Sequence, residues 1–168
     1  MQSHPKLKIE LSATDKAIEV SGYILLVLMW ALPLFYYSRL PEIIPIHFNA
    51  AGKVDGYGIK ATIFLLPAIG SALFAGLKIL NRFPHIHNYA VKITTENALK
   101  QYTNSTRLVR LINTVVLLVF AIIVFEIIQT ASGKSSTLGI WFLPFTLLLI
   151  LVPVTFFTVK SFSLNRDK

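Results

Sequence analysis

The sequence predicts an all-α integral membrane protein with four transmembrane helices. Of its 168 residues, 54% are hydrophobic and 14% are charged, whereas soluble domains are about 45–50% apolar and about 25% charged. Four apolar runs of about 20 residues are each long enough to cross a hydrocarbon core of roughly 30 Å. They are residues 18–37, 61–80, 108–128 and 138–159. Because these runs use most of the chain, we expect residues 1–168 to form a single membrane domain.

The first run is expected to be a retained helix and not a signal peptide. A polar segment precedes it, and no small-residue cleavage site follows Tyr37. The chain has no cysteine, which excludes disulfide and thiol chemistry.

The net charge of +8 is distributed unevenly along the chain. The basic residues lie in or beside the N-terminal tail, loop 81–107 and the C-terminal tail, except for Arg39, Lys53, Lys60 and Lys134. Basic residues near membrane spans stay in the cytoplasm, which predicts cytoplasmic termini and a multi-pass protein of the cytoplasmic (inner) membrane. The charge then indicates topology and attraction to the lipid bilayer, and not nucleic-acid binding.

Loop 38–60 is consequently expected on the outer face, together with the short loop 129–136. Apolar and other residues alternate over 44–49, a period that predicts a short strand. Asn49-Ala-Ala-Gly52 and Asp55-Gly56 are expected to supply turns, and Asp-Gly is among the stronger short turn signals. We expect a short extended or hairpin-like cap on the outer membrane face.

Three of the predicted spans carry a proline toward the outer end: Pro33, Pro67 and Pro144. A proline inside a helix removes a donor and frees a carbonyl, which in a membrane must be satisfied by protein or water. Polar contacts are therefore expected beside these prolines.

Loop 81–107 changes character along its length. Its first part is basic and aromatic, and His85 and His87 either share a metal or lie at the level of the lipid headgroups. From Thr94 or Thr95, each a suitable N-cap, we expect a helix that runs unbroken to Ile128, about 50 Å away. Just before this loop, Lys78 is expected to extend to the membrane interface.

Four candidate binding residues belong to the outer end: His47, Asn49, Asp55 and Glu126. Glu126 is the carboxylate deep in a span, where an unpaired charge is costly. These residues either recognise a ligand or partner, or they are structural. In the structural alternative the loop residues bond their own turns, and Glu126 reaches the interface or pairs with Lys134. Without an HExxH pattern or paired histidines in the loop, we predict no metal and no cofactor.

The loop also carries an ordered motif, which consists of Pro45, His47-Phe48-Asn49, Gly52, Asp55-Gly56 and Lys60. This motif resembles a bacterial membrane family of unknown function, which also forms the N-terminal region of SdpI-type immunity proteins. The resemblance covers about residues 22–80 and implies a shared membrane module, with immunity or signal transduction as its role. Residues 108–168 depart from the SdpI-type pattern, because its characteristic C-terminal membrane region is not recognisable there.

We therefore expect a non-enzymatic protein of the bacterial envelope that binds a peptide, lipid or protein partner through loop 38–60. One alternative is a small oligomeric transporter or channel, in which Asn113 and Glu126 line a path; Asn113 can equally bond a neighbouring helix. The other is a membrane metalloenzyme that uses His47, Asp55 and Glu126.

Overall fold

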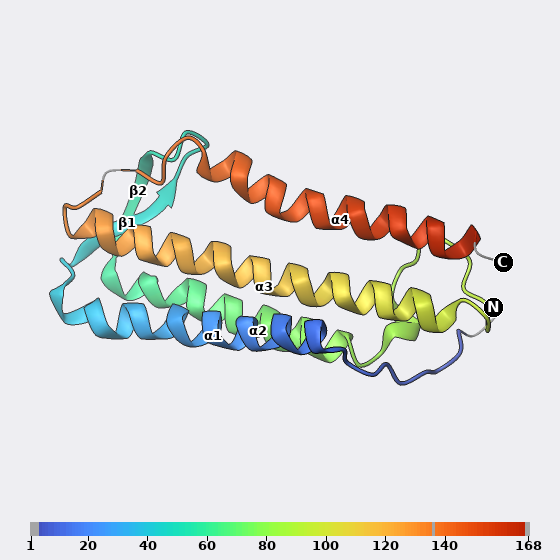
Figure 1. The fold of residues 1–168 in the computed structure, drawn as a ribbon. Coiled ribbons are helices and arrows are strands. Elements are labelled where there is room, and N and C mark those ends of the chain that lie inside the picture. Colours follow the sequence, from blue (N-terminus) through green and yellow to red (C-terminus); the bar gives the residue numbers. More distant parts are fainter. Residues whose placement is uncertain (1–3, 136, 167–168) are drawn as a thin grey trace.

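The computed structural model describes residues 4–135 and 137–166 and is mostly helical (Figure 1). The helices are α1 (Ala13–Tyr36), α2 (Leu65–Leu80), α3 (Ala98–Ala131) and α4 (Phe142–Arg166), and the strands are β1 (Ile43–Phe48) and β2 (Val54–Ile59). Within the described residues, four helical segments are long and apolar enough to cross a membrane, as predicted. The end of the bundle where the chain starts and finishes lies opposite the β-hairpin (Figure 1). We call these the terminal end and the hairpin end.

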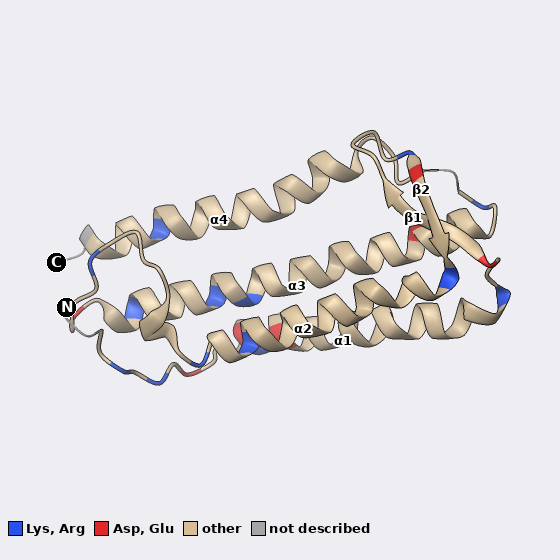
Figure 2. Ribbon diagram, turned by 180° about the vertical axis from the view of Figure 1, so that it is seen from behind, with Lys and Arg blue, Asp and Glu red and all other residues tan. Residues whose placement is uncertain are grey.

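Helix α3 is the central element of the bundle. In Figures 1 and 2 it lies between α4 on one side and α1 and α2 on the other. Its 34 residues correspond to about 51 Å at 1.5 Å per residue. The hydrophobic core lies where α3 meets α1 and α2, and includes Met29, Phe74, Leu117, Val124 and Ile128.

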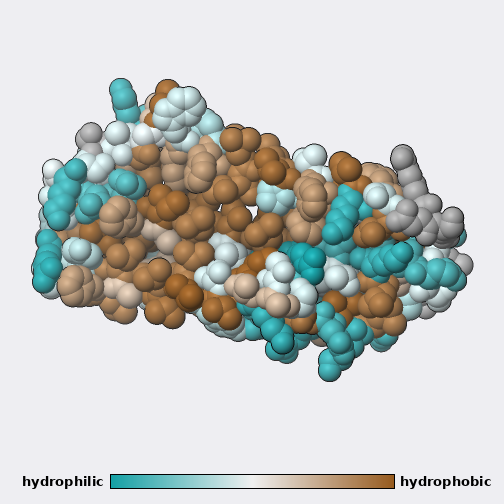
Figure 3. Space-filling view, viewed as in Figure 1, coloured by the Kyte–Doolittle hydropathy of each residue, from teal (hydrophilic) through white to brown (hydrophobic). Residues whose placement is uncertain are grey.

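The outer surface of the bundle is apolar around its middle. Figure 3 shows hydrophobic side chains over the middle of the molecule, whereas hydrophilic ones gather at both ends. Figure 2 shows the basic residues concentrated at the terminal end. This arrangement is the one expected of a multi-pass membrane protein, since apolar side chains face lipid and charged ones lie near the headgroups.

The two helices expected to begin on the cytoplasmic side, α1 and α3, start differently. Ser12 and Asp15 form a capping box, so α1 begins before the apolar run that predicted it. Before α3, the Thr94 amide donates to Asn97 Oδ1 at 2.8 Å, and the Asn97 amide donates to Thr94 Oγ1 at 3.4 Å. Helix α3 therefore begins later than the predicted Thr95 and then continues unbroken to Ala131, as expected.

The prolines differ from the expectation. Pro33 lies inside α1, but Pro67 and Pro144 lie in the first turns of α2 and α4. Amides in a first turn have no intrahelical acceptor, so Pro144 frees no carbonyl. Pro67 differs, because a 3-10 helix over Lys60–Phe64 runs directly into α2. The proline that interrupts α4 is Pro153, which the sequence reasoning did not single out.

The hairpin is antiparallel and irregular. Pro45 pairs with Tyr57 and His47 with Gly56, which leaves Ile46 as an extra residue in β1. This bulge breaks the predicted alternation, because Ile44 is buried whereas Ile46 is 47% exposed. A Cβ at Gly56 would approach His47 Cβ to 3.0 Å, so the Asp-Gly sequence leaves room for the bulged strand.

The loop between α2 and α3 is seated on the bundle through His87 and Tyr89. His87 Nδ1 lies 2.7 Å from Ser105 Oγ, and its Nε2 lies 3.2 Å from the carbonyl oxygen of Leu80. The Tyr89 hydroxyl donates to the carbonyl of Pro84 at 2.7 Å. Since both ring nitrogens of His87 already have partners, the arrangement does not favour a metal shared with His85. Burial lowers the pKa of His87 and raises that of Tyr89.

Helix α4 is attached to α3 at the terminal end by a series of amide side chains. Asn97 Nδ2 donates to Asn165 Oδ1 at 3.0 Å, and Asn104 Nδ2 donates to the carbonyl of Phe157 at 2.8 Å. Between them, Gln101 Nε2 donates to the carbonyl of Ser161 at 2.8 Å, and Gln101 Oε1 accepts from the Ser161 hydroxyl at 2.6 Å. Along the rest of α4, large apolar side chains are mostly exposed.

Candidate functional site

The base of the hairpin is closed by Lys60 and Glu42. Lys60 Nζ lies 2.8 Å from Glu42 Oε1, and the Lys60 amide donates to the Glu42 carbonyl at 2.9 Å. The ammonium group also lies 5.2 Å from the centre of the Tyr37 ring. The motif lysine therefore joins the end of β2 to the segment that enters β1.

The turn of the hairpin is built on Asn49. Its side-chain oxygen accepts from the amides of Ala51 and Lys53 at 2.9 and 3.1 Å. The backbone amide of Asn49 donates to the Lys53 carbonyl at 2.8 Å. An asparagine that bonds the backbone ahead of it is a common way to fix a turn. Asn49 thus has the structural role that the sequence allowed as an alternative.

His47 and Asp55 form a polar pair across the two strands. His47 Nδ1 lies 2.5 Å from Asp55 Oδ1. The two side chains are 70% and 43% exposed, so the pair lies on the surface of the hairpin. An exposed pair of this kind contributes little to stability. Because both side chains are exposed, both are accessible to a binding partner.

The turn also holds the segment that leads into α4. The Gly52 carbonyl accepts from Thr137 Oγ1 at 2.6 Å and from the Leu138 amide at 2.9 Å. Lys53 forms an isolated β-bridge with Thr137. The hairpin is thereby joined to the segment between α3 and α4, although Ser136 of that segment lies outside the described residues.

A pocket of about 640 Å³ lies beneath the hairpin. We call it the hairpin pocket. Strand β1 lines it together with the start of α2, Ile123 and Ile127 of α3, and Phe142 and Leu143 at the start of α4. The wall is predominantly apolar, and His47, Asn49 and Thr62 contribute the polar side chains. The structure therefore brings two of the predicted site residues, His47 and Asn49, to one cavity.

Glu126 does not join this group. One of its carboxylate oxygens is buried and has no hydrogen-bond partner in the described part of the chain. The expected pair with Lys134 is not formed, since the ion pairs of the described residues do not include Glu126. Among the described residues, no cluster of three His, Asp or Glu side chains could hold a metal. His47, Asp55 and Glu126 are consequently not a ligand set here.

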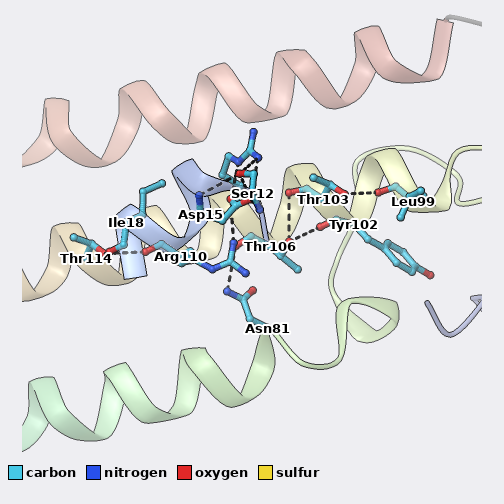
Figure 4. Close-up of polar contacts among 11 residues, drawn as sticks. Ser12, Asp15, Ile18, Asn81, Leu99, Tyr102, Thr103, Thr106, Arg110 and Thr114 are labelled. Atoms are coloured by element: carbon cyan, nitrogen blue, oxygen red, sulfur yellow. Dashed lines mark hydrogen bonds and ion pairs between the residues drawn. The ribbon is translucent and has the colours of Figure 1, made fainter. Parts of the chain in front are cut away.

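The sequence reasoning missed an ion cluster at the terminal end (Figure 4). The Asp15 side chain is 4% exposed, and it lies 2.7 Å from Arg107 Nε and 3.3 Å from Arg110 Nη1. Asp15 precedes the apolar run of the first span, and the sequence reasoning did not single it out. Its capping relation to Ser12, three residues earlier, was the available signal.

Lys78 and Asn113 both act between helices. Lys78 Nζ lies 2.9 Å from Glu19 Oε1 of α1 and contacts the Tyr23 hydroxyl, two contacts that the expected interfacial position did not include. Asn113 Nδ2 donates to the Phe74 carbonyl of α2 at 3.2 Å. This bond is the helix-packing alternative for Asn113, and it gives the transport alternative no support.

These elements define a class of protein, namely a multi-pass, membrane-type helical protein with a β-hairpin and a pocket at one end. Residues 24–70 match the family described as "Domain of unknown function (DUF1648)". The match begins within α1, contains the whole hairpin and ends within α2. It thus includes the loop motif that carried the resemblance.

A relative from Archaeoglobus fulgidus, described as an uncharacterized protein, is 38% identical over 81 residues. The aligned part covers 47% of this chain and 44% of that relative, so the chain matches less than half of the relative's length. Because this relative is archaeal, such sequences are not confined to bacteria. No solved structure matches the chain.

Proposed function

We propose that this chain is a non-enzymatic membrane protein that recognises an amphiphilic partner through the hairpin pocket. The observation that supports this most is the pocket itself, which has about 640 Å³ of space and a mainly apolar wall. Ligand sites commonly have about 300–1,000 Å³, an apolar lining and a few polar groups that orient the ligand. His47 is such a polar group, and its bond to Asp55 holds the ring in place at 2.5 Å.

In this proposal the hairpin faces the outside of the cytoplasmic membrane, because basic residues concentrate at the opposite end. The partner then carries an apolar segment, from a lipid or a peptide, that enters the pocket, and a polar group that reaches His47. The resemblance to SdpI-type immunity proteins makes toxin immunity or signal transduction the role that we propose for this binding.

Filling the pocket tests the proposal. We expect Ile123→Trp to displace whatever co-purifies with the protein, which native mass spectrometry of gently solubilised protein would detect as lost bound mass. Ile122→Trp is the matched control, since Ile122 is its neighbour on α3 and does not line the pocket. Equal bound mass in both variants and in the wild type would contradict a ligand in the hairpin pocket.

Substitutions of His47 and Asn49 distinguish a role in recognition from a role in folding. His47→Ala removes an exposed side chain, so the protein should remain in the membrane at normal abundance while the bound mass is lost. Asn49→Ala removes both side-chain bonds of the turn, so it should lower abundance. If His47→Ala also depletes the membrane of protein, the His47–Asp55 pair is structural and the proposed role is wrong.

A further inference from the structure

A second cavity lies at the terminal end, far from the hairpin. It has a volume of about 360 Å³ and is bounded by α1, α2, α3 and the N-terminal tail. Four basic side chains line it, namely Lys8 of the tail, Lys78 and Arg82 at the end of α2, and Arg110 of α3. Glu19 is the acidic side chain of the same wall.

The positive charge of this wall is incompletely compensated. Lys78 is paired with Glu19 at 2.9 Å, and Arg110 shares Asp15 with Arg107. Lys8 and Arg82 form no ion pair with any other described residue. At least two positive charges therefore remain at the rim of the cavity, and a bound anion would lower their mutual repulsion.

Apolar side chains form a second part of the wall. Leu7, Ile9 and Leu11 of the tail and Phe74 of α2 line the same cavity as the basic side chains, together with the polar Asn81, Asn113 and Thr114. The tail is held in place, because its Pro5 carbonyl accepts from the Tyr102 hydroxyl at 3.0 Å. The cavity therefore exists without a ligand and offers cations next to an apolar surface.

We propose that this cavity is a binding site for an anionic phosphate ester, supplied in the membrane by the headgroup of an acidic phospholipid. Arg and Lys are the side chains that bind phosphate oxygens most strongly. Basic pockets between helices at the headgroup level have the chemistry that selects acidic lipids. The apolar wall would receive the glycerol backbone and the first part of the acyl chains. The site is independent of the hairpin pocket, so either can fail without the other.

The test measures the melting temperature of the purified protein in neutral detergent while short-chain phosphatidylglycerol is added. Short-chain phosphatidylcholine and inorganic phosphate serve as parallel additions. We expect saturable protection by phosphatidylglycerol and much weaker protection by the net-neutral choline lipid. If inorganic phosphate protects equally, the anion site stands and its source is free phosphate. Equal protection by both lipids would overturn the proposal.

The variants assign the effect to the cavity. K8Q/R82Q should weaken the apparent affinity for phosphatidylglycerol by about tenfold or more, since each basic group near a lipid surface contributes about 1 kcal/mol. K6Q/K92Q is the matched control, because it removes the same charge from exposed residues that do not line the cavity. If K8Q/R82Q does not accumulate, R82Q against K92Q gives the same comparison. Identical affinities in variant and control would show that the lipid acts elsewhere.

Discussion

Gly52, at the turn of the hairpin, lies so close to Gly139 before α4 that a Cβ at Gly52 would meet the Gly139 carbonyl oxygen at 2.6 Å. Gly52 also has a φ of +74°, a conformation that side-chain-bearing residues rarely adopt. Two features therefore require glycine at position 52, namely its positive φ and the close approach of Gly139. Its carbonyl bonds to Thr137 and Leu138 then hold the hairpin against the start of α4.

We expect Gly52→Ala to destabilise the protein more than Gly133→Ala does. Gly133 has a φ of +72° and no neighbouring atom within 4 Å of a Cβ, so its substitution costs only the strain of the left-handed conformation, about 1–2 kcal/mol. Gly52→Ala adds the clash with Gly139. Thermal unfolding of both variants in detergent provides the comparison, and equal losses would show that the contact with Gly139 is easily relaxed.

Asp15→Asn should cost about 3–5 kcal/mol of unfolding free energy, because it leaves partly buried guanidinium groups without their carboxylate. The Asp15 side chain is 4% exposed and contacts both Arg107 and Arg110. Glu42→Gln provides the control, since that carboxylate is 85% exposed in its pair with Lys60 and should change stability little. Similar unfolding midpoints for the two variants would mean that water screens the Asp15 cluster.

The stability of the protein should depend on the protonation of His87. Burial lowers the pKa of His87 below its ordinary value of 6.5, and the hydrogen bond to Leu80 opposes this shift only in part. As the pH falls below that ordinary value, the unfolded chain binds a proton that the folded chain does not, so the stabilising contribution is present at higher pH and is lost on acidification.

His87→Gln removes this titration while leaving a polar side chain. We expect wild type to lose more stability than His87→Gln between about pH 7.5 and about pH 5.5, as measured by denaturant unfolding in detergent. The two proteins differ at this side chain alone, so the difference between their pH profiles isolates His87. Parallel pH profiles would show that the His87 pKa is the same in the folded and unfolded chains.

Gln101 is expected to be the main polar attachment of α4. Gln101→Ala removes the side-chain hydrogen bonds to the buried Ser161 hydroxyl and carbonyl, and the hydroxyl left without this acceptor costs about 1–3 kcal/mol. Gln129→Ala on the same helix is the control, because its side chain forms no hydrogen bond within the described residues. Hydrogen exchange of α4 amides should rise in the Gln101 variant and not in the control.

Local sequence features predicted the helical segments and the hairpin well. Apolar runs of membrane-spanning length identified the four helices, because length and hydropathy are properties of each segment alone. The turn signal Asn49-Ala-Ala-Gly52 marks the turn of the hairpin, whereas the predicted turn at Asp55-Gly56 was wrong, because both residues lie inside β2. The bulge at Ile46 was not predictable, since it depends on how β1 packs against the bundle as well as on its alternation.

Contacts between segments far apart in the sequence were not predicted. Lys78 meets Glu19 across two helices, and Asp15 meets Arg107 across most of the chain. Neither pair has a spacing that marks it in one sequence, so the sequence predicted an interfacial position for Lys78 and no contact for Asp15. The hairpin pocket could not be predicted for the same reason, because residues of β1, α2, α3 and α4 line it together.

Helix α4 is held by polar bonds at its terminal end, through Asn97, Gln101 and Asn104, and at its start through the Gly52 turn. Its middle section presents mainly apolar side chains to the surroundings. We therefore expect bilayer composition to affect α4 more than any other helix, since lipid tails replace protein neighbours along much of its length. The thickness and fluidity of the membrane would then act on the shape of the hairpin pocket through Phe142 and Leu143, which belong to both.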